Sequence, residues 1–316
     1  MGLSVLPPPA RPGDRVGVAA LSGPVDPDRL DRGLAALRGL GFEPVPAANL
    51  GERAGLFAGD DRRRLAAFHD LAADPSLKAI FFARGGHGVL RVLPGIDWAL
   101  LAAHPRAYVG YSDLTPFLLA VTARLGLVAF HGPMVAADLA RGITGEEAAS
   151  LLAALAGDYP RAYPVAGARD GNGAAGPGAG GGVTSAVSGP VSGPLLGGCL
   201  SLITALLGTP YLPDLGGAVL FWEDVDEPLY RLDRMLTHLR LSGSLSALSA
   251  MVIGHAEPTN ARGEPPAVWL TDALAGFMPP LAWGLAAGHR APNLTLPLGL
   301  TARLEPATRR LICGEG

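Results

Sequence analysis

Short apolar runs alternate with amphipathic segments along the first half of the chain. A short apolar run is typical of a strand buried on both faces, and apolar residues three or four positions apart are typical of a helix with one buried face. An N-cap at Asp26 followed by Pro27 marks the first predicted helix, which ends at Gly41. Strands separated by helices predict a parallel sheet with helices on both faces. Strands are predicted at 16–20, 42–45, 79–83, 107–110 and 128–130, with further helices at 60–73 and 114–125.

The pattern changes after residue 164. Residues 165–194 are dominated by Gly, Ala, Ser and Pro without apolar periodicity, which is typical of a flexible linker or loop. Apolar strands and amphipathic helices then resume and predict a second, smaller α/β domain. Its helices are predicted at 199–207 and 228–241, its strands at 218–222 and 250–254, and short apolar runs occur at 294–296 and 309–312. Because 316 residues favour about two domains, we expect domains at 1–164 and 195–316, joined by a Gly/Ala-rich linker or loop at 165–194.

Composition and charge exclude several classes of protein. Hydrophobic residues make up 49% and charged residues 17% of the chain, a balance typical of well-packed soluble proteins. A net charge of −3 provides no basic field for binding nucleic acid or an anionic membrane. We find neither a membrane-spanning apolar segment nor a signal-peptide pattern, so we expect a cytoplasmic protein. Two distant cysteines, Cys199 and Cys313, argue against a disulfide framework and a structural zinc site.

A serine stands at the most informative turn of the sequence. The apolar strand that begins near Tyr108 ends in Gly-Tyr-Ser-Asp and passes directly into a helical pattern. At such a turn the hydroxyl of Ser112 is exposed, and the N–H groups of the following helix suit a developing oxyanion. Ser112 is therefore a candidate nucleophile. A serine before a helix is more often only an N-cap, and Leu114 replaces the second glycine of the G-x-S-x-G motif.

A glycine-rich segment, Arg84-Gly85-Gly86-His87-Gly88, follows the third predicted strand. Consecutive glycines let backbone N–H groups approach a ligand closely, which makes this a candidate oxyanion or anion loop. It has neither the Gly-Lys-Ser/Thr of a Walker A motif nor the spacing of the dinucleotide fingerprint. An ordinary tight turn fits the same residues.

Two further candidates, Glu223 and His289, follow apolar segments of the second half. Glu223 lies where a strand runs out into a helix start, the usual place for a functional side chain in α/β folds. The carboxylates that precede Pro228 also fit a plain helix start, because they complement the helix dipole. His289 is one of seven histidines, and the residues alone do not favour it over His131 or His255.

Six segments stand in an order and spacing that match a known family. They are ARGGHGVLRVLPGIDW (83–98), GYSDLT (110–115), HGPM (131–134), LLGGCLSLITALLGTPYLPDL (195–215), FWEDVDEPLYRLDRML (221–236) and GHRAPNLTLPLG (288–299). Together they resemble the LD-carboxypeptidase (muramoyltetrapeptide carboxypeptidase) family, which also includes the microcin C self-immunity serine hydrolases. The likeness runs from about Arg11 to Leu304, nearly the whole chain.

The resemblance implies both a fold and a catalytic triad. The fold is an N-terminal parallel-sheet domain of Rossmann or flavodoxin-like type plus a smaller C-terminal α/β domain, with the active site at their interface. The nucleophile falls on Ser112 in the N-terminal domain, and the acid and base fall on Glu223 and His289 in the C-terminal one. His289 would take the proton of Ser112, while Glu223 would fix the histidine tautomer and steady the imidazolium.

The oxyanion hole implied by the resemblance consists of the backbone N–H of Asp113 and one from the Gly85-Gly86 turn. No cofactor and no metal are implied, and the sequence shows no convincing metal site.

Two positions depart from the family pattern, and two arginines are candidates for binding substrate. The family usually has Tyr where this chain has His87, and Asn where it has Cys199. Both residues could line the substrate pocket. A carboxypeptidase must also bind a terminal carboxylate, for which Arg84 and Arg231 are candidates, although acidic neighbours favour a structural ion pair for Arg231.

The implied activity is release of terminal D-alanine from L,D bonds of cytoplasmic murein tetrapeptides during peptidoglycan recycling. The partner is then a murein peptide or another D-Ala-ended small peptide, and the resemblance allows for a homodimer. The nearest alternative is hydrolysis of peptidyl or aminoacyl nucleotides, as in the immunity proteins, for which an aromatic residue that stacks on a purine would be expected; residues 165–194 contain none. A catalytically silent ligand-binding protein is a second alternative, against which the intact Ser112, Glu223 and His289 argue.

Overall fold

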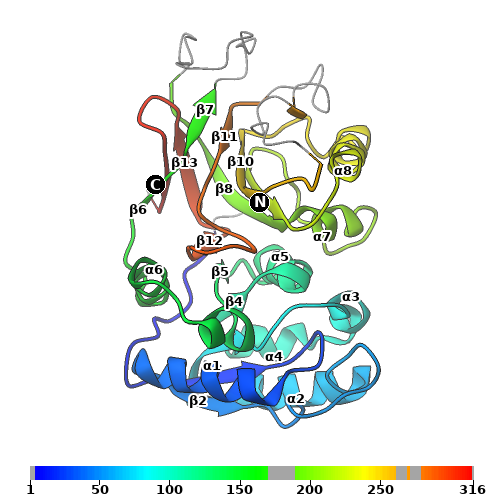
Figure 1. The fold of residues 1–316 in the computed structure, drawn as a ribbon, viewed down its shortest axis with the longest axis vertical. Coiled ribbons are helices and arrows are strands. Elements are labelled where there is room, and N and C mark those ends of the chain that lie inside the picture. The colour runs from blue at the N-terminus through cyan, green and yellow to red at the C-terminus, as the bar shows by residue number, and fades with distance from the viewer. Residues whose placement is uncertain (1–3, 170–188, 261–268, 271–278, 315–316) are drawn as a thin grey trace.

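A computed structural model describes residues 4–169, 189–260, 269–270 and 279–314. Within them, two sheets lie one above the other along the long axis of the molecule (Figure 1). The first is a six-stranded sheet in the order β12-β5-β4-β3-β1-β2. Neighbouring strands are parallel except β12, which is antiparallel to β5. Its strands are β1 (Arg15–Ala19), β2 (Glu43–Pro46), β3 (Leu77–Phe82), β4 (Ala107–Gly110), β5 (Ala129–His131) and β12 (Leu296–Leu298).

The second sheet has eight strands in the order β6-β14-β13-β8-β9-β10-β11-β7. Its centre, β8 to β11, is parallel, and the strands on both sides of this centre are antiparallel to their neighbours. Its strands are β6 (Arg161–Pro164), β7 (Gly167–Arg169), β8 (Val191–Cys199), β9 (Val219–Asp224), β10 (Ala250–Ala256), β11 (Leu281–Trp283), β13 (Thr301–Glu305) and β14 (Arg310–Cys313).

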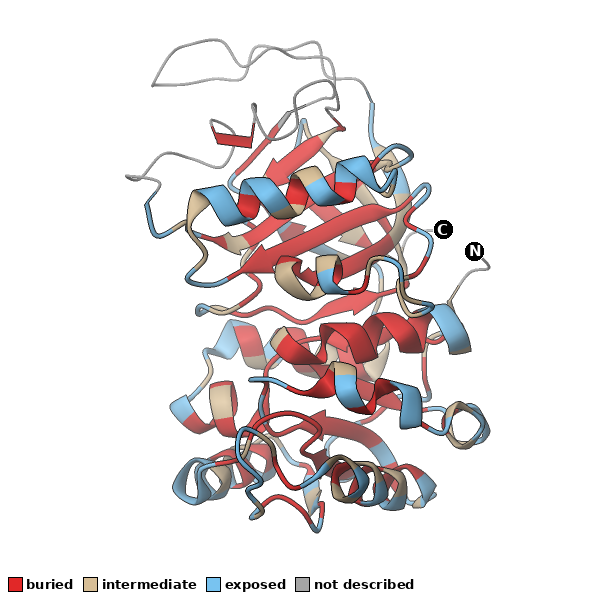
Figure 2. Ribbon diagram, turned by 90° about the vertical axis from the view of Figure 1, so that its right-hand side faces the viewer, coloured by how far each residue is buried: buried red, intermediate tan, exposed pale blue. Residues whose placement is uncertain are grey.

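Helices cover the sheets and fill the space between them. Helices α2, α4 and α5 pack side by side, whereas α1 packs against the π-helical turn Val135–Leu139. Every residue of α5 from Thr115 to Thr122 is buried, because α5 contacts β4 and β5 of the first sheet and also β8 and α7. Figure 2 shows buried residues continuing from one sheet to the other through this level. The helices are α1 (Pro27–Gly39), α2 (Asp61–Ala73), α3 (Val89–Val92), α4 (Trp98–Ala103), α5 (Thr115–Leu125), α6 (Gly145–Ala156), α7 (Leu200–Ala205) and α8 (Leu229–Leu241).

The mixed α/β architecture predicted from the sequence is confirmed, and most predicted elements are present within one to three residues. Asp26 caps α1 as expected, since its side chain accepts a hydrogen bond from the Arg29 N–H. The helix predicted from residue 114 begins instead at Thr115, after a 3₁₀ turn over Ser112–Leu114. The helix predicted at 199–207 is shorter, because Cys199 still belongs to β8.

Two strands pair in the sheet of the other predicted domain. β6 lies within the range 1–164 but pairs with β14 of the second sheet. β12 lies within 195–316 but pairs with β5 of the first sheet. Of the predicted linker or loop at 165–194, residues 170–188 lie outside the described residues, and the remainder contributes to β7 and β8.

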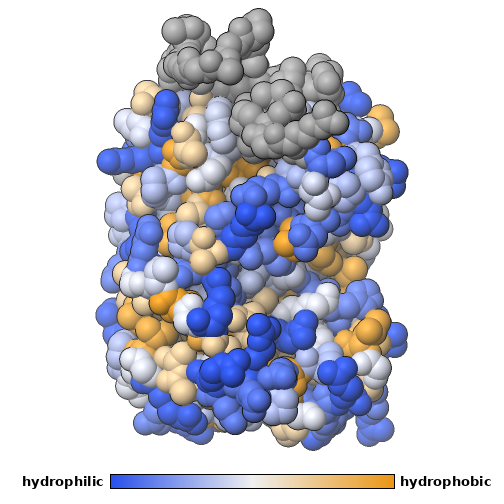
Figure 3. All heavy atoms as spheres, viewed as in Figure 1, coloured by the Kyte–Doolittle hydropathy of each residue, from blue (hydrophilic) through white to orange (hydrophobic). Residues whose placement is uncertain are grey.

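The outer surface is mostly polar on the face drawn in Figure 3, with apolar residues scattered over both halves. Among the described residues, the large apolar side chains that are exposed include Leu56, Tyr230 and Leu241. Within the part of the chain that the structure describes, no helix has the length and apolar character needed to cross a bilayer.

Candidate active site

Ser112 lies at the carboxyl end of β4, where the backbone takes a strained conformation. Its φ angle is +61°, in the left-handed region that residues other than glycine rarely adopt. The preceding residues are extended, and Ser112 itself begins the 3₁₀ turn that leads into α5. Such a turn lifts the side chain out of the sheet, and stored strain of this kind is typical of functional residues.

The glycine-rich loop after β3 lies directly against Ser112. A Cβ atom at Gly85 would stand 2.9 Å from the Cβ and 3.0 Å from the Oγ of Ser112, and 3.4 Å from the Asp113 nitrogen. Only glycine leaves this space open. The carboxylate of Asp113 ties the two segments together, because it accepts hydrogen bonds from the Val89 N–H at 3.0 Å and the Ser22 hydroxyl at 2.8 Å.

Glu223 and His289 meet Ser112 in an unbroken row of hydrogen bonds. The Nε2 atom of His289 lies 2.9 Å from Ser112 Oγ, and its Nδ1 atom lies 2.7 Å from Glu223 Oε2. The same carboxylate oxygen also accepts the backbone N–H of His289 at 3.2 Å. Glu223 extends from β9 and is fully buried, whereas the His289 side chain is 17% exposed. Gly288, with φ +121°, lets the loop pass close to Glu223, since a Cβ there would lie 2.5 Å from Oε2.

Burial and the neighbouring carboxylates set the protonation of this pair. Burial alone lowers the pKa of His289, but the hydrogen bond and charge of Glu223, helped by Asp224 and Asp138, outweigh it, and the pKa of His289 is raised. Burial raises the pKa of Glu223, an effect that its hydrogen bond to His289 partly offsets. His131, which is also fully buried, has its pKa lowered by burial to about 3 and therefore stays neutral.

A pocket of about 210 Å³ opens beside Ser112 and His289. Arg84 and Arg29 provide positive charge in its wall, Asp26 provides a carboxylate, and glycine, alanine, methionine and the site side chains complete the lining. The guanidinium of Arg84 donates to the backbone oxygens of Gly85 at 3.1 Å and Pro24 at 3.2 Å. The lining residues are Asp26, Arg29, Arg84, Gly85, Gly86, Tyr111, Ser112, Met134, Ala136, Ala137 and His289.

Comparison with known proteins identifies the family. Residues 16–132 match the LD-carboxypeptidase N-terminal domain, and residues 192–304 match the LD-carboxypeptidase C-terminal domain. A putative carboxypeptidase from Streptomyces coelicolor is 38% identical to this chain, over 98% of each protein. This chain belongs to the LD-carboxypeptidase family. A probable murein peptide carboxypeptidase from Bacillus subtilis is 32% identical over 99% of this chain and 96% of that protein.

Solved structures of relatives share the fold over nearly their whole length. The microcin C7 self-immunity protein of Escherichia coli, in complex with aspartyl sulfamoyl adenosine, is 25% identical, with a TM-score of 0.86 over 99% of both chains. A muramoyltetrapeptide carboxypeptidase from Oxalobacter formigenes is 29% identical, with a TM-score of 0.81 over 95% of this chain and 99% of that one. This LD-carboxypeptidase family member is accordingly a hydrolase of the peptidase class.

The four residues predicted to bind substrate lie in different parts of the structure. Arg84 lines the pocket, as described above. Arg231 lies on α8 and pairs with Glu227 at 3.2 Å, which is the structural ion pair that its acidic neighbours predict. His87 is exposed and faces the ring of Phe57, and Cys199 is buried at the end of β8. Neither His87 nor Cys199 is among the described residues that line the pocket, so a role in binding stays a prediction.

Several pocket residues carry no motif that would identify them in the sequence. Arg29 lies in the first turn of α1, and Ala136 and Ala137 lie in the π-helical turn after β5. The available signal is topological, because the loops after parallel strands meet at one edge of a sheet. Segments that follow β1, β3, β4 and β5 all contribute to this pocket.

Proposed function

We propose that this chain is a serine-type LD-carboxypeptidase that releases terminal D-alanine from L,D bonds of cytoplasmic murein tetrapeptides. The hydrogen-bonded row of Ser112, His289 and Glu223, next to a pocket with arginine in its wall, carries this proposal. Relatives named for murein peptides support the substrate class: the Bacillus subtilis protein above and a murein tetrapeptide carboxypeptidase from Pseudomonas aeruginosa, 31% identical.

The proposed reaction follows the acyl-enzyme route of a serine hydrolase. His289 Nε2 accepts the hydroxyl proton as Ser112 Oγ attacks the carbonyl carbon of the L,D bond, and Glu223 stabilises the resulting imidazolium. The backbone N–H groups of Asp113 and of the Gly85-Gly86 turn bind the developing oxyanion. His289 then gives the proton to the departing amine of D-alanine, and water, activated by the same histidine, releases the peptide from Ser112.

Recognition of the terminal carboxylate is the step that makes a peptidase a carboxypeptidase. The guanidinium of Arg84 is held by two backbone oxygens, and among the described residues no carboxylate forms an ion pair with it. A cation fixed in this way is preorganised to bind an anionic ligand. We assign the substrate carboxylate to Arg84, with the small side chains of Ala136 and Ala137 next to the D-alanine methyl group.

Hydrolysis of aminoacyl nucleotides is the second candidate function. The fold match to the microcin C7 self-immunity protein in complex with aspartyl sulfamoyl adenosine favours it. A nucleotide base would require an aromatic platform for stacking. The only aromatic rings in the described pocket wall are those of Tyr111 and His289, and Tyr111 packs edge-on against His289 at 5.0 Å between ring centres.

A direct comparison of the two substrate classes tests the proposal. The wild-type chain is incubated in parallel with a murein tetrapeptide, containing L-lysine or diaminopimelate, and with aspartyl sulfamoyl adenosine. We expect a larger kcat/KM for release of D-alanine from the tetrapeptide. Hydrolysis of the nucleotide analogue without any release of D-alanine would replace our proposal by the second candidate.

A further inference from the structure

Helix α6 of the first half holds the loop that carries His289. Glu147, in the first turn of α6, is fully buried, and one of its carboxylate oxygens accepts the Thr144 N–H at 2.7 Å as part of a capping box. The other oxygen accepts the backbone N–H of Asn293 at 2.8 Å and a guanidinium N–H of Arg141 at 3.3 Å. A buried carboxylate with three donors is thus shared between a helix cap and a loop from the far end of the chain.

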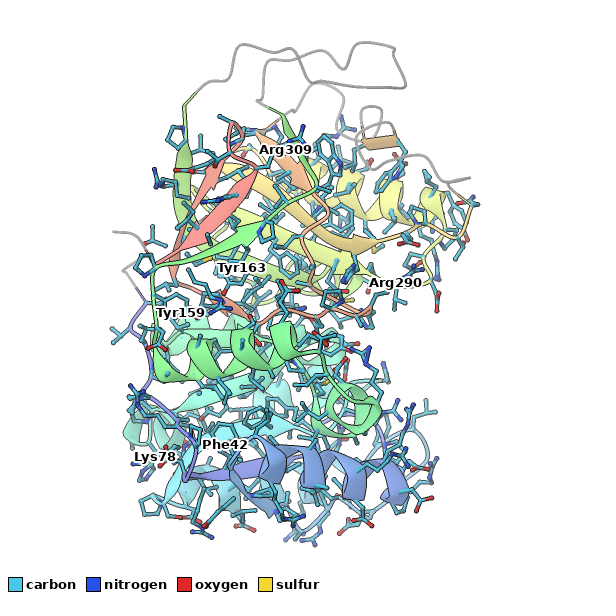
Figure 4. The ribbon with its side chains drawn as sticks, turned by 60° about the vertical axis from the view of Figure 1, so that its left-hand side comes forward. Phe42, Lys78, Tyr159, Tyr163, Arg290 and Arg309 are labelled. Atoms are coloured by element: carbon cyan, nitrogen blue, oxygen red, sulfur yellow. The ribbon has the colours of Figure 1, made fainter. Side chains whose placement is uncertain are left out.

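Asn293 connects Glu147 to Gly288, the residue before His289. Its side-chain oxygen accepts the backbone N–H of Gly288 at 2.9 Å, so that this hydrogen bond closes the loop that contains His289. The loop lies at the level between the two sheets, where Arg290 marks its exposed side in Figure 4. Beyond the loop the chain enters β12, which pairs with β5 of the first sheet.

Arg141, which donates to Glu147, is also connected to Tyr111, whose ring contacts His289. Arg141 also donates to Asp138 at 3.1 Å, and Asp138 accepts the hydroxyl of Tyr111 at 3.3 Å. Tyr111 directly precedes Ser112 and contacts the ring of His289 edge-on. Hydrogen bonds from Glu147 and Arg141 therefore extend to Gly288, which precedes His289, and to Tyr111, which precedes Ser112.

We propose that Glu147 is a positioning residue that fixes His289 relative to Ser112. Glu223 orients His289 from the second sheet, whereas Ser112 belongs to the first, so a contact from the first half is needed to set the distance between nucleophile and base. Glu147 provides it through Asn293 and Arg141. Neither Glu147 nor Asn293 is among the described residues that line the pocket. The inference rests on the nucleophile and base of the proposed function and adds a residue that does not touch the substrate.

The variant Glu147→Gln distinguishes the role of Glu147 in the helix cap from its contacts with Asn293 and Arg141. Glutamine at this position can still complete the capping box, but its amide group then faces the donors of Asn293 and Arg141. Because small misplacements of reacting groups cost about a hundred-fold in rate, we expect kcat for the tetrapeptide to fall about ten- to a hundred-fold. KM should stay within about twofold, since the pocket is unchanged. Hydrogen exchange of the peptide covering 288–295 should become faster.

Ser150→Ala is the matched control, and Asn293→Ala is the second variant. Ser150 is equally buried on the same helix and accepts the Thr295 N–H at 3.0 Å, but it has no contact with Gly288 or Asn293 among the hydrogen bonds of the described residues. We expect Ser150→Ala to lower the melting temperature and leave kcat within about twofold. Asn293→Ala, which keeps the Glu147 carboxylate, should reproduce the loss of kcat, and it decides the question if Glu147→Gln does not fold.

Three outcomes are distinguishable. A loss of kcat in Glu147→Gln and Asn293→Ala, but not in Ser150→Ala at a similar melting temperature, supports the positioning role. Wild-type kcat in the first two variants, or an equal loss in all three, overturns it and leaves the proposed function intact. A wild-type chain that hydrolyses aspartyl sulfamoyl adenosine but releases no D-alanine overturns the proposed function alone, and kcat of the same three variants for that substrate then decides the positioning role.

Discussion

His289 can act as a base only while its ring is neutral, and its surroundings work against that state. The buried Glu223 carboxylate at 2.7 Å, with Asp224 and Asp138 further away, raises the pKa of His289 despite its burial. The cost is a smaller neutral fraction at neutral pH, and the gain is a stronger base with a fixed tautomer. The side chains that decide the chemistry are therefore those that contact His289.

The pH dependence of kcat/KM should show this effect. Since the base must be neutral, activity falls as pH drops through the pKa of His289, and the half-maximal point should lie above the ordinary histidine value of about 6.5. In Glu223→Gln the largest raising influence is lost while burial remains, so the half-maximal point should move to lower pH than in the wild type. Turnover should also fall by roughly 10⁴, as in other triads that lose the acid.

The matched control for this prediction is Glu227→Gln. Glu227 lies four residues further along and pairs with Arg231 instead of His289. Its replacement removes the same formal charge and should leave the half-maximal pH of kcat/KM unchanged. An unchanged half-maximal pH in Glu223→Gln would show that Glu223 does not set the pKa of His289.

At the level of elements, two loops at the edge of the first sheet hold the candidate nucleophile and the proposed oxyanion hole. The turn after β4 holds Ser112 at φ +61°, and the loop after β3 brings Gly85 against it. The Asp113 carboxylate, which accepts the Val89 N–H, keeps the two loops at a fixed separation. An oxyanion hole built from these two backbones depends on that separation.

Gly85→Ala should therefore reduce activity, with some loss of stability because the added Cβ would also stand 2.9 Å from Ser112 Cβ. The added Cβ would stand 3.0 Å from Ser112 Oγ, and displacing one oxyanion donor typically costs about 10²- to 10³-fold in kcat. Gly39→Ala, at a helical position where a Cβ meets no atom within 4 Å, is the control and should leave kcat unchanged. Equal activity of Gly85→Ala and the wild-type chain would remove this loop from the oxyanion hole.

The same elements show what the sequence could and could not predict. β1, β3 and β4 each contain an apolar run that is buried on both faces, and they are predicted within three residues. β8 escapes prediction, since Gly and Pro fill much of its sequence and its pairing with β9 and β13 depends on distant segments. α6 is not among the predicted helices, although the capping box of Thr144 and Glu147 is a readable signal.

The site residues divide in the same way. The family pattern places Ser112, Glu223 and His289, and the structure brings all three together. Arg29 carries no local signal, and the capping box of Glu147 does not reveal its contact with Asn293, because both positions depend on how α1 and α6 pack against distant segments. Contacts between distant segments are the part that periodicity and spacing leave open.

On the scale of the whole molecule, the two halves cannot be divided at one point of the chain. β6 crosses into the second sheet and β12 returns to the first. The hydroxyl of Tyr163 on β6, labelled in Figure 4, donates to the Thr295 oxygen at 2.9 Å next to β12. Helix α5 is buried from both sides. The pairing of Ser112 with His289 therefore depends on a continuous core.

A fragment of residues 1–158 should not fold on its own. It lacks β12, and it exposes the face of α5 that contacts β8 and α7. Exposing a buried side chain of the size of leucine costs about 1.5–3 kcal/mol, against a total stability of about 5–15 kcal/mol for a typical domain. We expect thermal melting by circular dichroism to show no cooperative transition. A transition near that of the full chain would instead establish an independent N-terminal domain.

Release of D-alanine from a murein tetrapeptide by the wild-type chain and by Ser112→Ala tests directly whether Ser112 is the nucleophile. Loss of the nucleophile of a working triad typically lowers turnover about a million-fold, and a hydroxyl-to-hydrogen change at this half-buried position should leave the melting temperature close to that of the wild type. We predict steady release by the wild-type chain and none above background by the folded variant. D-Alanine release at a comparable rate by folded Ser112→Ala would contradict the central claim that Ser112 is the nucleophile.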